Sequence, residues 1–143
     1  MSFWEPCWAC RLVHGESCGQ VVADTPDVIV AINPFAASPG HALIMPRVHI
    51  PNIYELPDSL AGPILAMAAR VARAAKSAFQ ADGITLRQNN DPASDQHLFH
   101  FHLHVIPRFE GDAQRFAAPA PLAPEAEQAA MAQRLRAVLQ SAR

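Results

Sequence analysis

The sequence lacks the features that would assign it to a membrane or to nucleic acid. No apolar run approaches the length of a membrane span, and the first seven residues hold no basic stretch followed by an apolar one, so we expect neither an anchor nor a secretory leader. Net charge is only −2 with histidine neutral, which argues against a nucleic-acid partner held by bulk electrostatics. We therefore expect a cytoplasmic protein that binds any anionic ligand locally.

Cysteine is scarce as well. The chain has three cysteines, an odd number, and two of them form the pair Cys7 and Cys10, which argues against a disulfide framework. Such a Cys-x-x-Cys pair is half of a tetrahedral zinc site. A redox role would require a strand before the pair, and only six residues precede Cys7. The pair favours structural zinc, with unpaired thiols as the alternative.

The chain nevertheless has enough apolar content for one core. It has 143 residues, half of them hydrophobic, which fits a single domain. Apolar and β-branched runs predict strands over residues 20–23, 28–32, 41–45, 84–89 and 96–106.

In another part of the chain the apolar residues have helical spacing. Apolar residues recur at helical intervals from Leu60 to Phe79, and we expect Asp58 or Ser59 to cap this helix and Gly83 to end it. We expect residues 1–112 to form the main domain, 113–124 a Pro/Ala-rich spacer that acts as a tether, and 125–143 an amphipathic C-terminal helix. The sequence does not say whether this last helix docks on its own chain or on a partner.

The most informative stretch is a row of histidines. His100, His102 and His104 alternate with apolar residues in the run 99–108, so on a strand all three imidazoles share one face. In one interpretation two of these imidazoles bind a catalytic metal. In the other, His102 is a nucleophile whose histidine neighbours lower its pKa and keep it neutral. Spacing alone does not decide between them.

Polar residues at predicted strand ends form a weaker set. Asn33, Asn89 and Gln96 each lie where a side chain can reach into a cleft, and Gly40 and His41 turn the chain into a strand. Taken alone, each of them fits a turn or a cap equally well.

Together these motifs resemble the histidine triad (HIT) family. The run 100–108 matches the triad signature, and Gln96 stands four residues before its first histidine. Weaker matches keep the family order at 7–10, 15–16, 39–41, 45–49 and 89–90, so that the resemblance extends from about Cys7 to Asp112. It implies an α+β HIT-like domain with an antiparallel sheet of about five strands, one long helix and a C-terminal helix.

The resemblance also implies an activity. The protein would be a nucleotidyl hydrolase or transferase, a homodimer, acting on nucleoside 5′-phosphate derivatives such as phosphoramidates or dinucleoside polyphosphates of purines. His102 would attack the α-phosphorus and carry a nucleotidyl-histidine intermediate. The other implied contacts are Gln96 and His104 with the α-phosphate, Asn89 in support, Asn33 with the ribose, and Trp8, Leu12 and Leu43 with the base.

The resemblance also implies a set of metal ligands, those of a zinc-carrying, bacterial-type branch of this family. They correspond here to Cys7, Cys10, His49 and His100, a closed set that makes the zinc structural. Three positions depart from the family pattern. Asp95 replaces a frequent glycine, His97 replaces a small or hydroxyl-bearing residue, and Ala9 replaces an aromatic one, so substrate preference can differ.

Two alternatives remain at this point. A nucleotide-binding or scaffold protein would keep the pocket with negligible turnover. A zinc metallohydrolase would hold its metal on the histidine strand.

Overall fold

The computed structural model describes residues 2–113 and 119–141. In chain order its elements are α1 (Trp8–Val13), β1 (Val21–Asp24), β2 (Val28–Ile32), β3 (Ala42–Pro46), the 3-10 turn η1 (Ile53–Glu55), α2 (Asp58–Phe79), β4 (Gly83–Arg87), the 3-10 turn η2 (Pro92–Ser94), β5 (Leu103–Arg108) and α3 (Glu125–Ser141). The strands form one sheet in the order β1-β2-β3-β5-β4, and every neighbouring pair is antiparallel. The predicted α+β class with about five antiparallel strands is confirmed.

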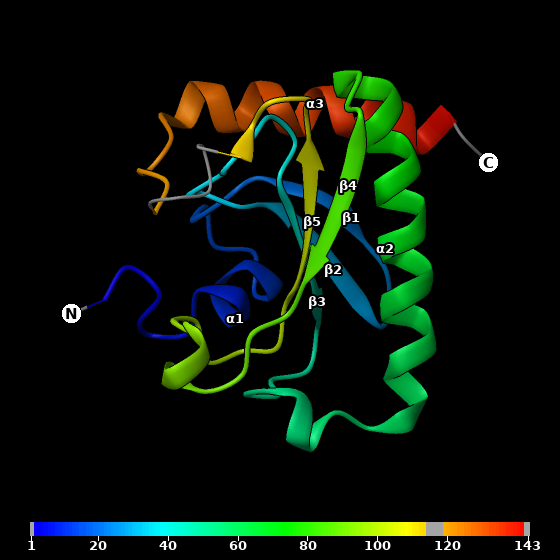
Figure 1. Ribbon diagram of the computed structural model, residues 1–143. Helices are drawn as coiled ribbons and strands as arrows, with labels where there is room; N and C mark the ends of the chain where they lie inside the picture. Colours follow the sequence, from blue (N-terminus) through cyan, green and yellow to red (C-terminus); the bar gives the residue numbers. More distant parts are fainter. Residues whose placement is uncertain (1, 114–118, 142–143) are drawn as a thin grey trace.

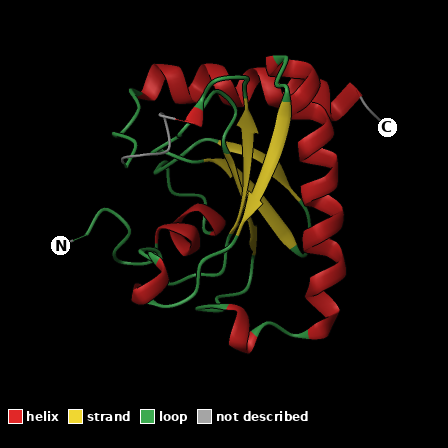
Figure 2. Cartoon of the chain, viewed as in Figure 1, coloured by secondary structure: helices red, strands yellow, loops and turns green. Residues whose placement is uncertain are grey.

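The two central strands are buried on both faces of the sheet. Every residue of β2 and β3 is buried, and their side chains alternate between two apolar clusters. Val30 and Ile44 face the larger cluster, which α2 and α3 complete, whereas Ile29 and Leu43 face the smaller one under α1. Figure 1 shows α1 and α2 on opposite sides of the sheet, and Figure 2 shows the same arrangement with the strands in yellow. Burial on both faces explains why these strands are continuous apolar runs rather than alternating ones.

The long helix is confirmed, but its predicted caps are wrong. Its N-cap residue is Pro57, which makes no side-chain capping bond, and Asp58 is already inside the helix. The left-handed residue that ends it is Gln80, with φ of 54°, and not Gly83. Gly83 instead opens β4 opposite Arg108. The helix therefore stops early enough for the chain to enter the sheet in register.

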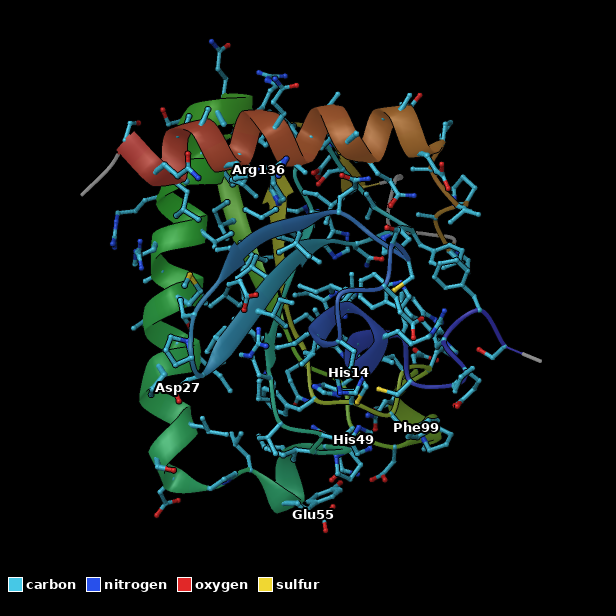
Figure 3. All side chains as sticks on the ribbon, turned by 180° about the vertical axis from the view of Figure 1, so that it is seen from behind. His14, Asp27, His49, Glu55, Phe99 and Arg136 are labelled. Carbon is cyan, nitrogen blue, oxygen red and sulfur yellow. The ribbon has the colours of Figure 1, made fainter. Side chains whose placement is uncertain are left out.

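The C-terminal helix docks on its own chain. Ala132, Leu135 and Leu139 of α3 are buried in the larger cluster with α2. The Arg136 guanidinium donates to the Val21 carbonyl of β1 at 3.3 Å, and Figure 3 shows this side chain directed from α3 toward the sheet. Of the predicted spacer, residues 114–118 lie outside the described part of the chain, while the Ala123 amide donates to the Pro34 carbonyl at 2.8 Å.

Two further differences concern the N-terminus and the histidine row. Cys7 caps the six-residue α1 and Cys10 lies within it, and the sequence did not predict this helix. The last strand begins at Leu103 and not at residue 96, so that His100, which lies in a bend, and His102 both precede the strand. No helix among the described residues is both long and apolar enough to cross a bilayer.

Candidate functional site

The predicted alternation of the histidine row is confirmed, although only its second half is strand. Phe101, Leu103 and Val105 pack in the α2 cluster. His102 and His104 line a cavity together with His41, on the other side of the row. Packing of these apolar side chains therefore fixes the positions of the imidazoles that alternate with them.

The cavity has a volume of about 680 Å³, a size typical of small-molecule sites. Its wall combines apolar side chains with polar ones that come from distant parts of the chain: Trp4, Asn33, Phe35, Ala37, His41, Arg87, Asn89, Asp95, His97, Leu98, His102, His104, Pro119 and Ala120. Loops at the ends of the strands supply most of these residues, and the predicted Asn33 and Asn89 are among them.

His102 is held in a defined tautomer. Its Nδ1 lies 2.8 Å from the His100 carbonyl oxygen, which can only accept, so Nδ1 carries the proton and Nε2 keeps a lone pair. Burial lowers the pKa of His102; the hydrogen bond to His100 opposes this shift, and the charge of Arg87 adds to it. His102 is therefore a neutral imidazole at pH 7, and its Nε2 makes no hydrogen bond to any described residue.

A second chain of hydrogen bonds fixes the tautomer of His104. The Ala37 amide donates to His41 Nδ1 at 3.0 Å, so the proton of neutral His41 is on Nε2. That Nε2 lies 2.9 Å from His104 Nδ1 and donates to it. The Asn33 amide nitrogen is also near His41 Nε2, at the longer distance of 3.4 Å. His104 Nε2 must then carry a proton, and it is the remaining donor of that ring.

Burial keeps both members of this pair neutral. It lowers the pKa of His41 to about 3, with the charges of Arg87 and His102 as smaller causes. It lowers the pKa of His104 to about 2, with His102, His41 and Arg87 contributing less. His41 was singled out in the sequence only as part of a turn, and the structure makes it a hydrogen-bond partner of His104.

Gln96 does not line the cavity. Its side chain is buried and accepts from the Asp91 amide at 2.7 Å while donating to the carbonyls of Pro51 and Leu98 at 2.7 and 3.1 Å. It therefore holds the ends of the loop before the triad. Asn89 does line the cavity and donates to the Ser94 carbonyl at 2.7 Å.

The three residues predicted to contact the base lie one layer behind the cavity. Trp8, Leu12 and Leu43 are buried in the cluster under α1, and none of them lines the cavity. The apolar wall consists instead of Phe35 and Trp4, whose ring centroids are 5.5 Å apart, and of Leu98. No sequence signal distinguished Trp4 from other N-terminal residues, because only the fold brings it beside the loop after β2.

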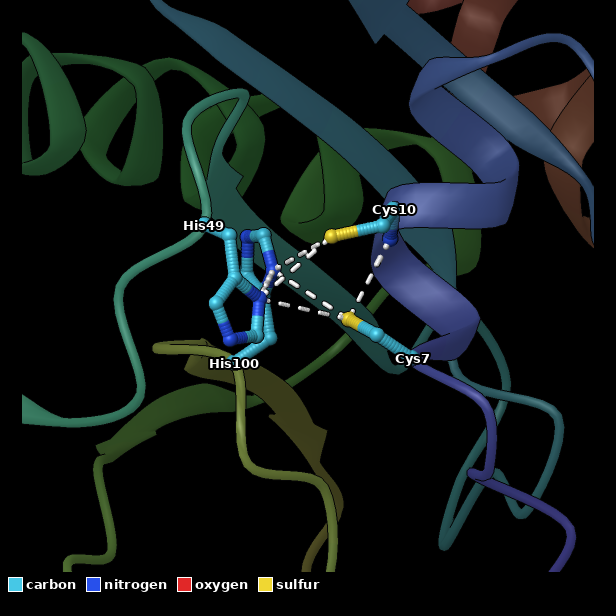
Figure 4. Close-up of side chains that lie close together, drawn as sticks. All are labelled: Cys7, Cys10, His49 and His100. Carbon is cyan, nitrogen blue, oxygen red and sulfur yellow. Dashed lines mark hydrogen bonds between the residues drawn. The ribbon is translucent and has the colours of Figure 1, made fainter.

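Four predicted metal ligands meet at one point. The donor atoms of Cys7, Cys10, His49 and His100 all lie within 4.8 Å of one another, and Figure 4 shows both sulfurs facing both imidazoles. Cys7 caps α1 and Cys10 follows one turn later, so that the helix presents both sulfurs on one side. His49 follows β3, and His100 begins the triad.

The distances fit a tetrahedral zinc site. Zinc bonds of about 2.3 Å to sulfur and about 2.0–2.1 Å to nitrogen give tetrahedral edges of about 3.6 Å for S···N and about 3.3 Å for N···N. The four S···Nδ1 distances are 3.6, 3.5, 3.4 and 3.7 Å, and the two Nδ1 atoms are 3.2 Å apart. His100 Nε2 donates to the Pro46 carbonyl at 2.7 Å, which orients Nδ1 toward the cysteines. Four protein ligands close the site, so its zinc is structural.

The same geometry disfavours a catalytic metal on the histidine row. His100 Nδ1 faces the cysteines, His102 Nδ1 bonds a carbonyl, and His104 Nδ1 bonds His41. The three rings therefore do not converge on one point. Among the described residues, the only cluster of potential ligands is the Cys₂His₂ set.

Comparison with known proteins identifies the family. The model of the HIT domain matches residues 14–111, more than half of the chain. The chain belongs to the HIT family. The protein called hit from Bacillus subtilis is 32% identical to this HIT protein over 109 residues, which cover 76% of this chain and 75% of that protein. The adenylylsulfatase HINT3 of Arabidopsis thaliana is 36% identical over 110 residues, 74% of this chain and 54% of the plant protein.

A solved structure supports both the fold and the metal. The zinc-bound histidine triad family protein of Mycobacterium smegmatis superposes with a TM-score of 0.81 at 27% identity and covers 92% of this chain and 91% of that protein. This HIT protein therefore shares its fold with a zinc-bound member of the family, and its own Cys₂His₂ set has the geometry for the same metal.

Proposed function

We propose that this HIT protein is a nucleotidyl hydrolase or transferase that acts on nucleoside 5′-phosphate derivatives through a nucleotidyl intermediate on His102. One observation carries the proposal: His102 is neutral, protonated on Nδ1 by its bond to the His100 carbonyl, and lines a cavity with Nε2 free. An imidazole in this state is a competent nucleophile toward phosphorus.

The first step forms the intermediate. The lone pair of His102 Nε2 forms a bond to the α-phosphorus, and the bond from phosphorus to the leaving group breaks with its electron pair on the leaving group. Negative charge on the phosphoryl oxygens needs donors that are already oriented. His104 Nε2–H is such a donor, because His41 and the Ala37 amide hold its tautomer.

The second step resolves the intermediate. A water oxygen bonds to phosphorus, the P–N bond breaks, and its electron pair returns to His102 Nε2. The two protons of water end on the nucleoside monophosphate and the leaving group, or in solvent. In a transferase, another hydroxyl replaces the water.

The cavity wall also offers places for the nucleoside. Phe35 and Trp4 form an aromatic surface for a purine base, and Asn33 lies between them and the histidines as a partner for the ribose hydroxyls. Gln96 acts by holding the loop that carries Asn89 near the phosphate. Trp8, Leu12 and Leu43 then support the base site from behind.

Zinc, when bound by Cys7, Cys10, His49 and His100, supplies a structural cross-link and no part of the reaction. It ties α1 and the segment after β3 to the residue whose carbonyl holds His102 Nδ1.

The quaternary structure and location are also proposals. β4 is an edge strand of the sheet, and its Leu86 is 46% exposed; an unpaired apolar edge favours pairing with a second copy. We therefore propose a homodimer through β4, which sedimentation analysis would detect, in a cytoplasmic protein that binds neither membrane nor nucleic acid.

A substrate panel tests the proposed activity. Incubation with adenosine 5′-phosphoramidate and with diadenosine triphosphate should release AMP, and His102→Ala should abolish the release. His14→Ala is the matched control, because His14 is an exposed histidine at the end of α1, and this variant should keep full activity. Tight AMP binding without turnover of any substrate would instead favour the nucleotide-binding or scaffold alternative.

A further inference from the structure

Arg87 is a cation in the cavity that the proposed steps leave without a role. It is the last residue of β4 and lies opposite His104 in the register between β4 and β5. Its side chain lines the same cavity as His41, His102 and His104. Arg87 is an exposed residue, yet its charge reaches the triad, because it opposes protonation of His41, His102 and His104 by lowering their pKa values.

The charge of Arg87 is not neutralised within the described part of the chain. Both ion pairs found there involve other residues, Arg47 with Asp24 and Arg108 with Asp112. Asp95 is the one carboxylate on the described cavity wall, and it forms no ion pair with Arg87. The imidazoles of His41 and His104 are neutral because burial lowers their pKa values. The guanidinium therefore faces the cavity as an uncompensated donor for an anion.

The order of the strands indicates which part of a substrate Arg87 meets. Asn33 and Phe35 lie in the connection between β2 and β3, His104 lies on β5, and Arg87 lies on β4. Across the sheet, in the order β2-β3-β5-β4, the proposed nucleoside contacts lie next to β2 and β3 and the phosphate contact lies on β5. Arg87 lies on β4, the next strand. A substrate with its base at Phe35 and its α-phosphate at His104 extends its leaving group toward β4.

We propose that Arg87 binds the anionic group beyond the α-phosphate and makes this protein selective for mixed anhydrides of nucleoside 5′-monophosphates with phosphate or sulfate. The inference rests on the proposed function, which places the α-phosphorus at His102. When the bond from phosphorus to the leaving oxygen breaks, the electron pair and a full negative charge remain on that oxygen. Arg87 stabilises this charge, whereas an amine leaving group takes up a proton and gains nothing from it.

Kinetics with three adenylyl substrates test the selectivity. For Arg87→Gln we expect kcat/KM to fall about 10- to 100-fold with diadenosine triphosphate and with adenosine 5′-phosphosulfate, the loss expected for one charge-assisted hydrogen bond, and less than about threefold with adenosine 5′-phosphoramidate. Arg87→Lys should recover part of the loss, because it keeps the charge but not the planar fork. A fall with only one of the two anhydrides would identify that anion as the preferred group. An equal fall with all three substrates, or with none, would overturn the proposal.

Arg73→Gln is the matched control. Arg73 is exposed on α2 and does not line the cavity, so this variant removes the same charge without changing the site and should match the wild type.

A binding measurement separates this inference from the proposed chemistry. Calorimetry with AMP and ADP in a His102→Ala background, which lacks the proposed nucleophile, needs no turnover: adding Arg87→Gln should reduce the preference for ADP over AMP about tenfold or more, and adding Arg73→Gln should leave it unchanged. An unchanged preference in Arg87→Gln would overturn the inference even if His102 proves to be the nucleophile. If AMP release survives His102→Ala, the proposed function fails, while the ADP preference still decides the role of Arg87.

Discussion

At the scale of single residues, the site depends on which ring nitrogen carries a proton. Two backbone groups decide this: the His100 carbonyl fixes the proton of His102 on Nδ1, and the Ala37 amide fixes that of His41 on Nε2. The triad therefore consists of unequal members. His102 presents a lone pair, His104 presents a donor, and His100 belongs to the metal site.

The role of His41 as a positioning residue gives the first prediction. His41→Ala should lower kcat about tenfold or more with little change in KM, because His104 is then free to move its proton to Nδ1 and lose the donor on Nε2. His41→Gln should recover part of the rate, since a side-chain amide can still donate to His104 Nδ1. Steady-state kinetics of AMP release measure both variants. A purely structural role would instead make the two variants equal in rate and different only in stability.

Burial of the neutral pair also predicts how stability depends on pH. The folded pKa values of His41 and His104, about 3 and about 2, lie below the ordinary value near 6.5. The unfolded chain therefore binds more protons than the folded one below about pH 6.5, and stability falls as pH decreases, by up to about 1.4 kcal/mol per pH unit for each histidine.

Denaturant unfolding at a series of pH values between 7 and 5 measures this slope. His41→Gln should show a shallower fall than the wild type, by up to about one proton. Parallel curves for the two proteins would contradict the assignment of His41 as a buried neutral group.

At the scale of elements, the zinc site connects segments that do not share a strand or a helix. It joins α1, the chain after β3 and the start of the triad at His100 (Figure 4). Because the His100 carbonyl also holds His102 Nδ1, a loss of metal should reach the nucleophile.

Metal analysis tests this coupling. The purified protein should contain about one zinc per chain, and Cys7→Ser should lose it, with a lower melting temperature and a lower kcat. His102→Ala should keep the zinc, because His102 is not a ligand. Loss of zinc in His102→Ala together with retention in Cys7→Ser would show that the metal lies on the histidine row after all.

The elements also show what could be predicted from the sequence and what could not. The β-branched runs and the spacing from Leu60 to Phe79 are local signals, and both gave the correct element. α1 was missed because six residues are too few to display a helical period. The start of β5 was misplaced because the alternation of histidine and apolar residues begins before the strand, at His100 in a bend, and alternation alone does not mark where strand pairing begins.

The site shows a similar division. The zinc ligands were predictable because a motif marks each of them, and the structure brings all four together. The apolar wall of the cavity was not predictable, because Trp4 and Phe35 meet only after folding. The residues that were predicted for it, Trp8, Leu12 and Leu43, lie behind that wall.

At the scale of the whole molecule, the terminal helix belongs to the same core as the sheet. The sequence separated residues 125–143 from the rest of the chain as a helix and left open what this helix docks on; Leu135 is fully buried in the cluster formed by α2 and the strands. A shared core predicts that the described elements unfold together.

Leu135→Ala tests this prediction. It should lower the free energy of unfolding by about 2–5 kcal/mol, the usual cost of a large core truncation. Far-UV circular dichroism and tryptophan fluorescence should report one common transition, because Trp4 and Trp8 lie near α1 on the other side of the sheet. If only the helical signal shifts, α3 is an independent unit.

The central claim is that His102 becomes covalently nucleotidylated. The most direct measurement is to quench the reaction with diadenosine triphosphate in its first turnovers, digest the protein, and locate any adenylyl group by mass spectrometry. We expect the group on His102 Nε2, in the wild type and in His14→Ala, and not in His102→Ala. Release of AMP at the wild-type rate with no adduct on His102, or with an adduct on another residue, would contradict this account.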